Sequence, residues 1–397
     1  MKTRAGIRFA KKSFVLTVIL LVTIFNTFPV QKATAKNADL RRLGHAYARL
    51  HTTAVGLSPL LPASLYYLAE TGSIFNGIKV QQIYRLGQDG KTITRITNEK
   101  GWGIPINFDV SPLDGTIAYG SGHQVITVDP NGKHRRVLLQ NTEDVFWLLW
   151  SPDGKSIVYQ SATGGLYLYR LVTKHAELLL SGTIGASPRP QSFSPDGKKL
   201  LVDHLASALD GAIYDFASRK ITAIPPWHST GKDIPVCENR VITWSTPASF
   251  FCSGPMMSAG TSLGGLWRVN ANTGSIKALV ADPKLPFQWI GAPRQDLTGK
   301  LYYLYGQYQD PRSLPTLSLM RSASDGIAGR VALRPEKFIV RQAFWTPGNT
   351  GLVILEMDNY AAISGLILVP MDPALPVTTL VTTGAADITE ASFRWGP

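Results

Sequence analysis

The chain has 397 residues, of which 44% are hydrophobic and 17% charged, and its formal net charge is +13 at pH 7. This is the composition of an ordinary globular protein with ample apolar residues for a large core. The positive charge suits anionic partners, but no dense Lys/Arg run with interleaved aromatics is present, which argues against nucleic-acid binding.

Residues 1–35 have the pattern of a secretory signal peptide. A basic start precedes an apolar run, Phe14 to Phe25, and Ala33-Thr34-Ala35 supplies small residues at the cleavage spacing. The alternative is a retained membrane anchor, but the apolar run is short for a spanning helix and contains two threonines. We therefore expect an exported protein, periplasmic or extracellular, with no stable membrane span after cleavage.

Residues 36–62 are expected to form a short amphipathic helix and a linker. Leucine and tyrosine recur at helical spacing between about Asp39 and His51, and Gly56 to Pro62 contains two prolines. The remaining residues, 63–397, contain a repeat.

Each repeat contains apolar runs separated by loops and by turns rich in Gly, Asp and Asn. The runs are apolar on both sides, as expected for strands covered on both faces. Four-stranded sheets standing face to face around an axis provide that cover, so the repeat predicts an all-β fold, a β-propeller. The first long run of each unit is Leu65–Leu68, Ile117–Tyr119, Ile157–Tyr159, Leu200–Val202, Phe250–Cys252, Leu301–Tyr305 and Leu352–Leu355.

An anchor residue, usually aromatic or apolar and followed shortly by proline, precedes each later unit. The anchors are Val110, Trp150, Phe193, Trp244, Gly291, Trp345 and Trp395. They predict a seven-bladed propeller of four-stranded blades; six blades is the alternative if the weak Gly291 anchor is false. Since the last anchor has no blade after it, the strand near Ser392 to Trp395 should complete the first blade and close the ring.

Two repeats, Trp150-Ser-Pro-Asp-Gly-Lys155 and Phe193-Ser-Pro-Asp-Gly-Lys198, resemble the TolB-type propeller repeat, also called the WD-like Pro-Asp repeat. The resemblance covers Ser64 to Pro397. It implies an exported propeller that binds proteins or small ligands.

The position four residues before each anchor is expected to begin an innermost strand. The symmetry of the propeller places these seven positions at one mouth of the central channel. Guanidinium groups there suit carboxylate or phosphate, and aromatic rings suit apolar walls. In the alternative interpretation, the arginines pair with acidic residues between blades. The predicted ligand-binding residues are Arg189, Arg240, Arg341, Phe146 and Phe287; Ile106 and Ala391 occupy the other two positions.

Catalytic motifs receive little support. Gly260-Thr-Ser-Leu-Gly264 fits a nucleophile elbow, but a strand follows it and no histidine occurs after it, so no catalytic triad is expected. The histidines are not at metal-ligand spacing, and we expect neither metal nor cofactor.

Whether Cys237 and Cys252 form a disulfide stays open. An extended strand would separate them too far, and a bridge requires that Asp233 to Glu238 fold back, which Pro235 permits.

Two hypotheses for function follow. The first is a non-catalytic scaffold that binds an envelope or extracellular protein, or a small anionic ligand at the channel mouth. The alternative is a propeller enzyme, a lyase or hydrolase, that acts on an anionic glycan.

The Ala33-Thr34-Ala35 pattern predicts that exported protein begins at Lys36. N-terminal sequencing of exported material checks this, and membrane-bound protein that still begins at Met1 would contradict it.

Overall fold

The computed structural model describes residues 59–75, 78–100, 105, 107–140, 143–182, 187–206, 209–224, 241–258, 261–280, 288–307, 314–360, 362–382, 387–388 and 393–397. The chain divides into two units, Met1–Leu57 and Ser58–Pro397, and all of the described residues belong to the second. The expected signal segment and the amphipathic helix fall outside the described residues. Within those residues, no helix is long and apolar enough to cross a membrane.

The second unit consists of seven four-stranded antiparallel sheets. The innermost strands are β28 (Arg394–Trp395), β4 (Phe108–Val110), β8 (Val145–Trp150), β12 (Arg189–Phe193), β16 (Val241–Thr246), β20 (Gln288–Gln295) and β24 (Val340–Trp345). The second strands are β1 (Leu65–Phe75), β5 (Ile117–Ser121), β9 (Ser156–Ser161), β13 (Lys199–Ala206), β17 (Ser249–Ser258), β21 (Leu301–Gln307) and β25 (Gly351–Met357).

The third strands are β2 (Ile78–Leu86), β6 (Gln124–Val128), β10 (Leu166–Arg170), β14 (Leu209–Asp215), β18 (Thr261–Asn270), β22 (Ser318–Ser322) and β26 (Ile363–Pro370). The outer strands are β3 (Ile93–Arg95), β7 (Arg136–Gln140), β11 (His175–Leu180), β15 (Ile221–Ala223), β19 (Ile276–Val280), β23 (Val331–Ala332) and β27 (Thr378–Val381). A short 3-10 helix, η2 (Pro347–Asn349), follows β24.

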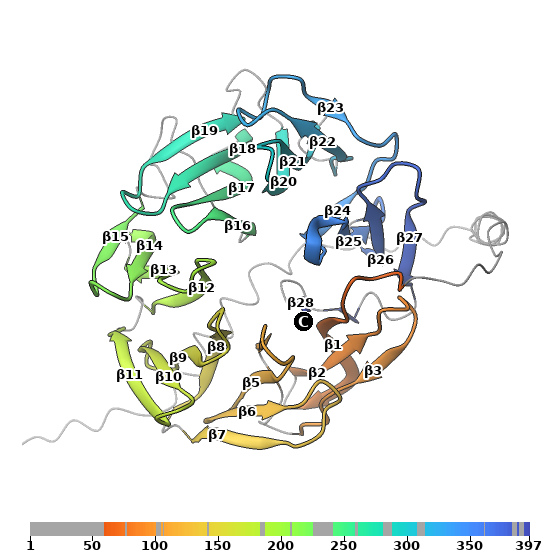
Figure 1. Cartoon of the computed structure of the whole chain (residues 1–397). Coiled ribbons are helices and arrows are strands. Elements are labelled where there is room, and N and C mark those ends of the chain that lie inside the picture. The colour runs from red at the N-terminus through yellow and green to blue at the C-terminus, as the bar shows by residue number, and fades with distance from the viewer. Residues whose placement is uncertain are drawn as a thin grey trace, which may run out of the picture. The chain divides into compact units, whose positions relative to one another are not determined.

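The sheets stand around a common centre as the blades of a propeller (Figure 1). Every residue of β5 and β9 is buried, as predicted for strands covered on both faces. The core lies between blades: Leu201 and Ile213 of the fourth blade pack with Phe250 and Trp267 of the fifth. The prediction of seven four-stranded blades is confirmed.

The Ser-Pro-Asp-Gly motif builds the turn between the first and second strands. Ser151 Oγ donates to Asp153 Oδ1 (2.6 Å) and accepts from the Ser156 amide (3.0 Å). The bond from the Ser151 hydroxyl lowers the pKa of the Asp153 carboxyl. Gly154 has φ +64°, a conformation that favours glycine. Ser194 and Asp196 repeat the serine–aspartate bond, so the motif is explained by turn geometry.

The C-terminal strand closes the ring, as predicted. Leu65 pairs with Trp395 and Tyr66 with Arg394, and an isolated bridge joins Ala69 to Ile388. The first blade therefore combines the last strand of the propeller with three strands from its beginning.

The anchor predicted in the sixth blade was wrong by four residues. Gln295 pairs with Leu301 at the start of β21, just as Trp345 pairs with Leu352 and Trp150 with Ile157. The Asp296 amide donates to the Lys300 carbonyl (3.0 Å), which is the turn bond of the other blades. Gln295 is therefore the anchor and not Gly291, because Asp-Leu-Thr-Gly replaces the Ser-Pro-Asp-Gly turn.

Cys252 lies in β17, is buried, and is disulfide-bonded. The chain has two cysteines, and the other, Cys237, lies outside the described residues.

Deleting Ile388 to Pro397 should remove the inner strand of the first blade and expose two apolar blade faces. We expect the variant to aggregate or to lose its cooperative thermal transition, because the cluster around Leu65 and Tyr67 includes Phe393 and Ile388. Differential scanning calorimetry tests this, and an unchanged transition would mean that β28 does not hold the ring closed.

Candidate functional site

Three tryptophan anchors tie their innermost strands to the preceding blade. The indole Nε1 of Trp244 donates to Ser192 Oγ (2.9 Å) in β12. Trp345 donates to the carbonyl of Ala292 (2.8 Å) in β20, and Trp395 to the carbonyl of Trp345 (2.8 Å). Three of the large side chains that mark the repeat in the sequence therefore join neighbouring blades. They fix the positions of the innermost strands, from which the proposed mouth residues project.

Asp109 in β4 extends these connections across three blades. Its Oδ1 accepts from Arg394 Nε (2.7 Å) in β28, and its Oδ2 accepts from the Trp150 amide (2.7 Å) in β8. Burial raises the pKa of this carboxyl, and Arg394 is the main opposing influence. Nearby, Asn107 Oδ1 accepts from the Leu148 amide (3.3 Å).

Five innermost strands are interrupted by bulges, and in β16 the bulge lies between Trp244 and Thr246. Phe146 and Trp147 form the bulge of β8, Gln191 that of β12, and Arg341 that of β24. In β20 the bulge lies between Gly291 and Arg294. Bulges change the direction of side chains and often occur beside functional sites. Two of the predicted residues, Phe146 and Arg341, therefore occupy irregular positions of otherwise regular strands.

Arg189 begins β12 and pairs with an acid of its own blade. Its Nε and Nη2 donate to the two carboxylate oxygens of Asp203 (2.9 and 2.6 Å). Its guanidinium also lies 4.9 Å from the centre of the Trp147 ring in the neighbouring blade. Gln191 Nε2 donates to the same carboxylate (2.7 Å). An additional anion could reach only the remaining N–H groups of Arg189.

Of the other four predicted residues, the structure describes two, Arg341 and Phe146. Arg341 is exposed and Phe146 is half-buried. Arg240 and Phe287 lie outside the described residues. Phe287 precedes the true anchor, Gln295, by eight positions, so it is not equivalent to the other four residues. The grouping of all five at one mouth stays a prediction.

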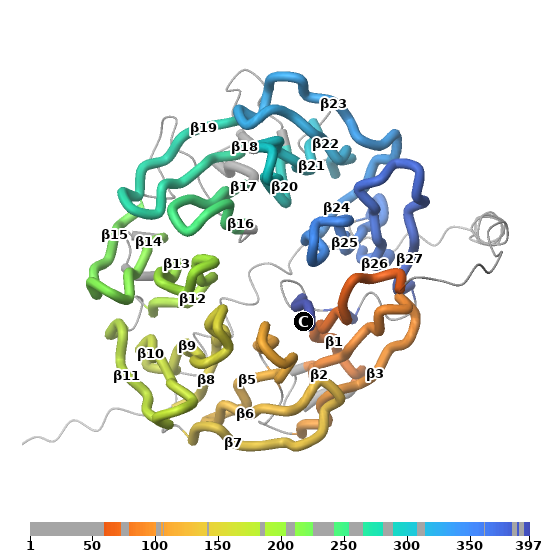
Figure 2. The backbone as a smooth tube through the Cα atoms, viewed as in Figure 1, coloured from red at the N-terminus to blue at the C-terminus, as the bar shows by residue number. Residues whose placement is uncertain are grey.

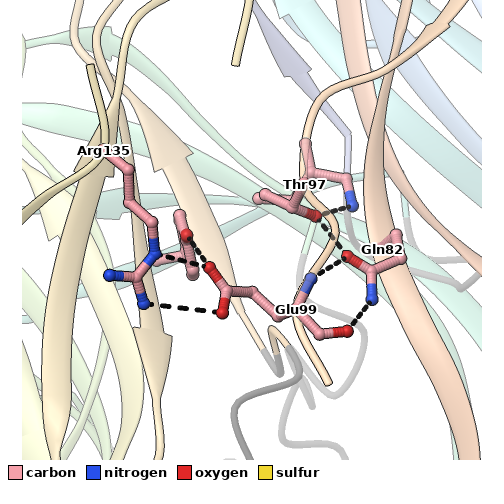
Figure 3. A network of polar contacts seen from close by, with 6 residues as sticks. Gln82, Thr97, Glu99 and Arg135 are labelled. Atoms are coloured by element: carbon pink, nitrogen blue, oxygen red, sulfur yellow. Dashed lines mark hydrogen bonds and ion pairs between the residues drawn. The ribbon is translucent and has the colours of Figure 1, made fainter. Parts of the chain in front are cut away.

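Figure 3 shows a polar network that the sequence did not reveal, between the first and second blades. Glu99 accepts from Tyr119 Oη (2.6 Å) and Arg135 Nε (2.8 Å), and its backbone carbonyl accepts from Gln82 Nε2 (2.7 Å). Thr97 Oγ1 donates to Gln82 Oε1 (2.7 Å). Burial, followed by the bond to Glu99, raises the pKa of the Tyr119 hydroxyl. Every group has a partner within the network, so we interpret it as a structural connection.

Catalytic chemistry gains no support from the predicted elbow. Ser262 lies inside β18, where it pairs with Met257 of β17, and not at a strand-to-helix turn. Among the described residues, no group of three or more His, Cys, Asp or Glu side chains could hold a metal ion.

No family model matches the chain. A Tol-Pal system protein TolB from Francisella tularensis subsp. mediasiatica is 36% identical over 111 residues, which cover 27% of this chain and 25% of that protein. The chain thus spans about a quarter of the length of the curated relatives it matches. Over these 111 residues the propeller is similar to TolB.

Solved structures with a similar fold are more distant in sequence. A protein from Lactobacillus plantarum is 13% identical, with 84% of this chain and 99% of that chain covered and a TM-score of 0.51. An oligogalacturonate lyase from Vibrio parahaemolyticus is 9% identical, with 81% and 86% covered and a TM-score of 0.50. At such identities these likenesses show the fold alone.

Proposed function

We propose that this chain is an exported protein-binding scaffold whose partner is an envelope or extracellular protein that docks at the mouth of the channel. The observation that carries this proposal is the set of bulges in the innermost strands. Those of β8 and β24 lie at Phe146, Trp147 and Arg341, so these side chains depart from the regular alternation of a strand. Rigid scaffolds that present irregular side chains are typical of binding proteins. The local match to a protein of the Tol-Pal system also supports an envelope partner.

We further propose that the mouth binds an anionic group of the partner or of a small ligand, with Arg341 and Arg240 as cationic residues and Phe146 as an apolar wall. Arg189 differs from these, because its guanidinium forms two bonds to Asp203 and its side chain is only 12% exposed. Its main contribution would be to hold Trp147 and Asp203 in place. Phe287 is not included in this proposal, because its position was counted from Gly291, which is not the anchor of its blade.

Arg341→Ala and Arg240→Ala should weaken binding about tenfold, since a hydrogen bond to a charged group contributes roughly 1.5 to 3 kcal/mol. The partner is first captured from envelope extract with the wild-type protein, and its affinity for each variant is then measured by calorimetry. The melting temperature of the Arg341→Ala protein should stay close to that of the wild type, because contacts of an exposed side chain contribute little to stability.

Arg189→Ala serves as the matched control and should lower the melting temperature, because it leaves the Asp203 carboxylate with fewer donors. Destabilised Arg341→Ala and Arg240→Ala proteins that still bind the partner would show that these arginines are structural. Turnover of an acidic polysaccharide would instead favour the glycan-acting enzyme.

A further inference from the structure

The outer strands of the second, third and fourth blades carry apolar side chains that no neighbouring blade covers. Val137 of β7, Leu178 of β11 and Ile221 of β15 are 45%, 51% and 46% exposed. Val172, in the turn before β11, is 87% exposed. We call this surface the basic rim: strands β7, β11 and β15 together with the turns 129–135, 171–174 and 216–220 that precede them.

Cationic side chains accompany these apolar ones. Lys133 and Arg136 flank the start of β7, Lys174 precedes β11, and Lys220 precedes β15; all four are exposed. None of the four forms an ion pair with a carboxylate of the described part of the chain, whereas Arg135 and Arg219 beside them do.

The carboxylates of the basic rim are already engaged. Asp129 Oδ1 accepts from the amides of Asn131 (2.9 Å) and Lys133 (2.8 Å). Asp215 Oδ1 accepts from the Ser218 amide (2.8 Å). Glu177 pairs with both Arg219 (2.6 Å) and Arg170 (3.5 Å). None of these carboxylates forms an ion pair with Lys133, Arg136, Lys174 or Lys220, and in the basic rim the Lys and Arg side chains outnumber the Asp and Glu side chains.

The basic rim is continuous from blade to blade. Arg219, in the turn before β15, reaches Glu177 of β11 in the preceding blade. Tyr169 Oη of the third blade donates to the carbonyl of Leu138 in β7 (3.0 Å). Figure 2 shows β7, β11 and β15 following one another along the outer side of the ring.

We infer that the basic rim docks on the surface of an anionic phospholipid bilayer. Lysine and arginine would contact lipid phosphates, while Val172 and Leu178 would enter the headgroup region, a combination that binds proteins to membrane surfaces. A nucleic acid or an acidic glycan would use the cations but not the exposed apolar side chains. The innermost strands lie at the other end of each sheet, so the channel mouth would stay accessible to a partner.

Vesicle co-sedimentation tests this inference with the full chain. The wild type should bind phosphatidylcholine vesicles that contain phosphatidylglycerol, bind pure phosphatidylcholine weakly, and lose binding as salt rises. Reversing the four charges with Lys133→Glu, Arg136→Glu, Lys174→Glu and Lys220→Glu should reduce binding at least about tenfold. Val172→Ser with Leu178→Ser should weaken binding without changing its salt dependence.

A control variant, Lys91→Glu, Lys277→Glu, Lys300→Glu and Lys337→Glu, changes the net charge equally at exposed positions on other blades and should bind like the wild type. All variants share residues 1–58, so a difference in vesicle binding between them comes from the propeller. An unchanged melting curve by circular dichroism shows that a variant is folded. Equal loss in both charge variants would overturn the inference, as would equal binding to neutral vesicles. Retention on heparin without vesicle binding would also overturn it and indicate an acidic glycan.

Discussion

A single buried carboxylate, that of Asp109, joins the innermost strands of three blades. It accepts one hydrogen bond from the guanidinium of Arg394 and one from the amide of Trp150, and its side chain is only 13% exposed. Burying a charge is costly unless it is paired and hydrogen-bonded, and breaking such a pair typically costs about 3 to 5 kcal/mol. Because Arg394 belongs to a strand of two residues, this interaction supports a closure that has few backbone bonds of its own.

The side-chain connections explain how the ring can be rigid at its centre and varied in its chemistry. The indoles of Trp244, Trp345 and Trp395 link three pairs of neighbouring innermost strands by hydrogen bonds. Bulges interrupt β8, β12, β16, β20 and β24. Outer strands have a different constraint, since one of their edges is unpaired and most are short. The proposed partner site and the proposed bilayer surface thus use opposite ends of the same sheets.

The architecture was predictable because its signals are local and repeated. Apolar runs without alternation indicated strands covered on both faces, and the terminal Trp395 anchor indicated closure. The sixth anchor was misplaced because Gln295-Asp-Leu-Thr-Gly299 lacks the aromatic and proline that mark the others, and only strand register reveals it. The pairing of Arg189 with Asp203 was missed because their proximity depends on that register as well.

The sequence could not indicate which cations are compensated. Asp109 and Arg394 are far apart in the chain, and Glu99 meets Arg135 only when two blades pack together. Whether a cation can bind an external anion depends on whether a carboxylate of the chain already pairs with it. Arg189 is largely neutralised by Asp203, whereas Lys174 and Lys220 form no ion pair among the described residues. Such distinctions come from three-dimensional contacts, so candidate sites are harder to predict than the fold.

Asp109 holds the ring as one closed unit, and a double-mutant cycle with Arg394 measures this interaction. Unfolding free energies of Asp109→Ala, Arg394→Ala and the double variant should show a coupling of about 1 kcal/mol or more. Asp109→Ala alone should cost more than Arg394→Ala, because it also deprives the Trp150 amide of its acceptor. Additive effects of the two substitutions would show that Asp109 and Arg394 do not hold the ring closed together.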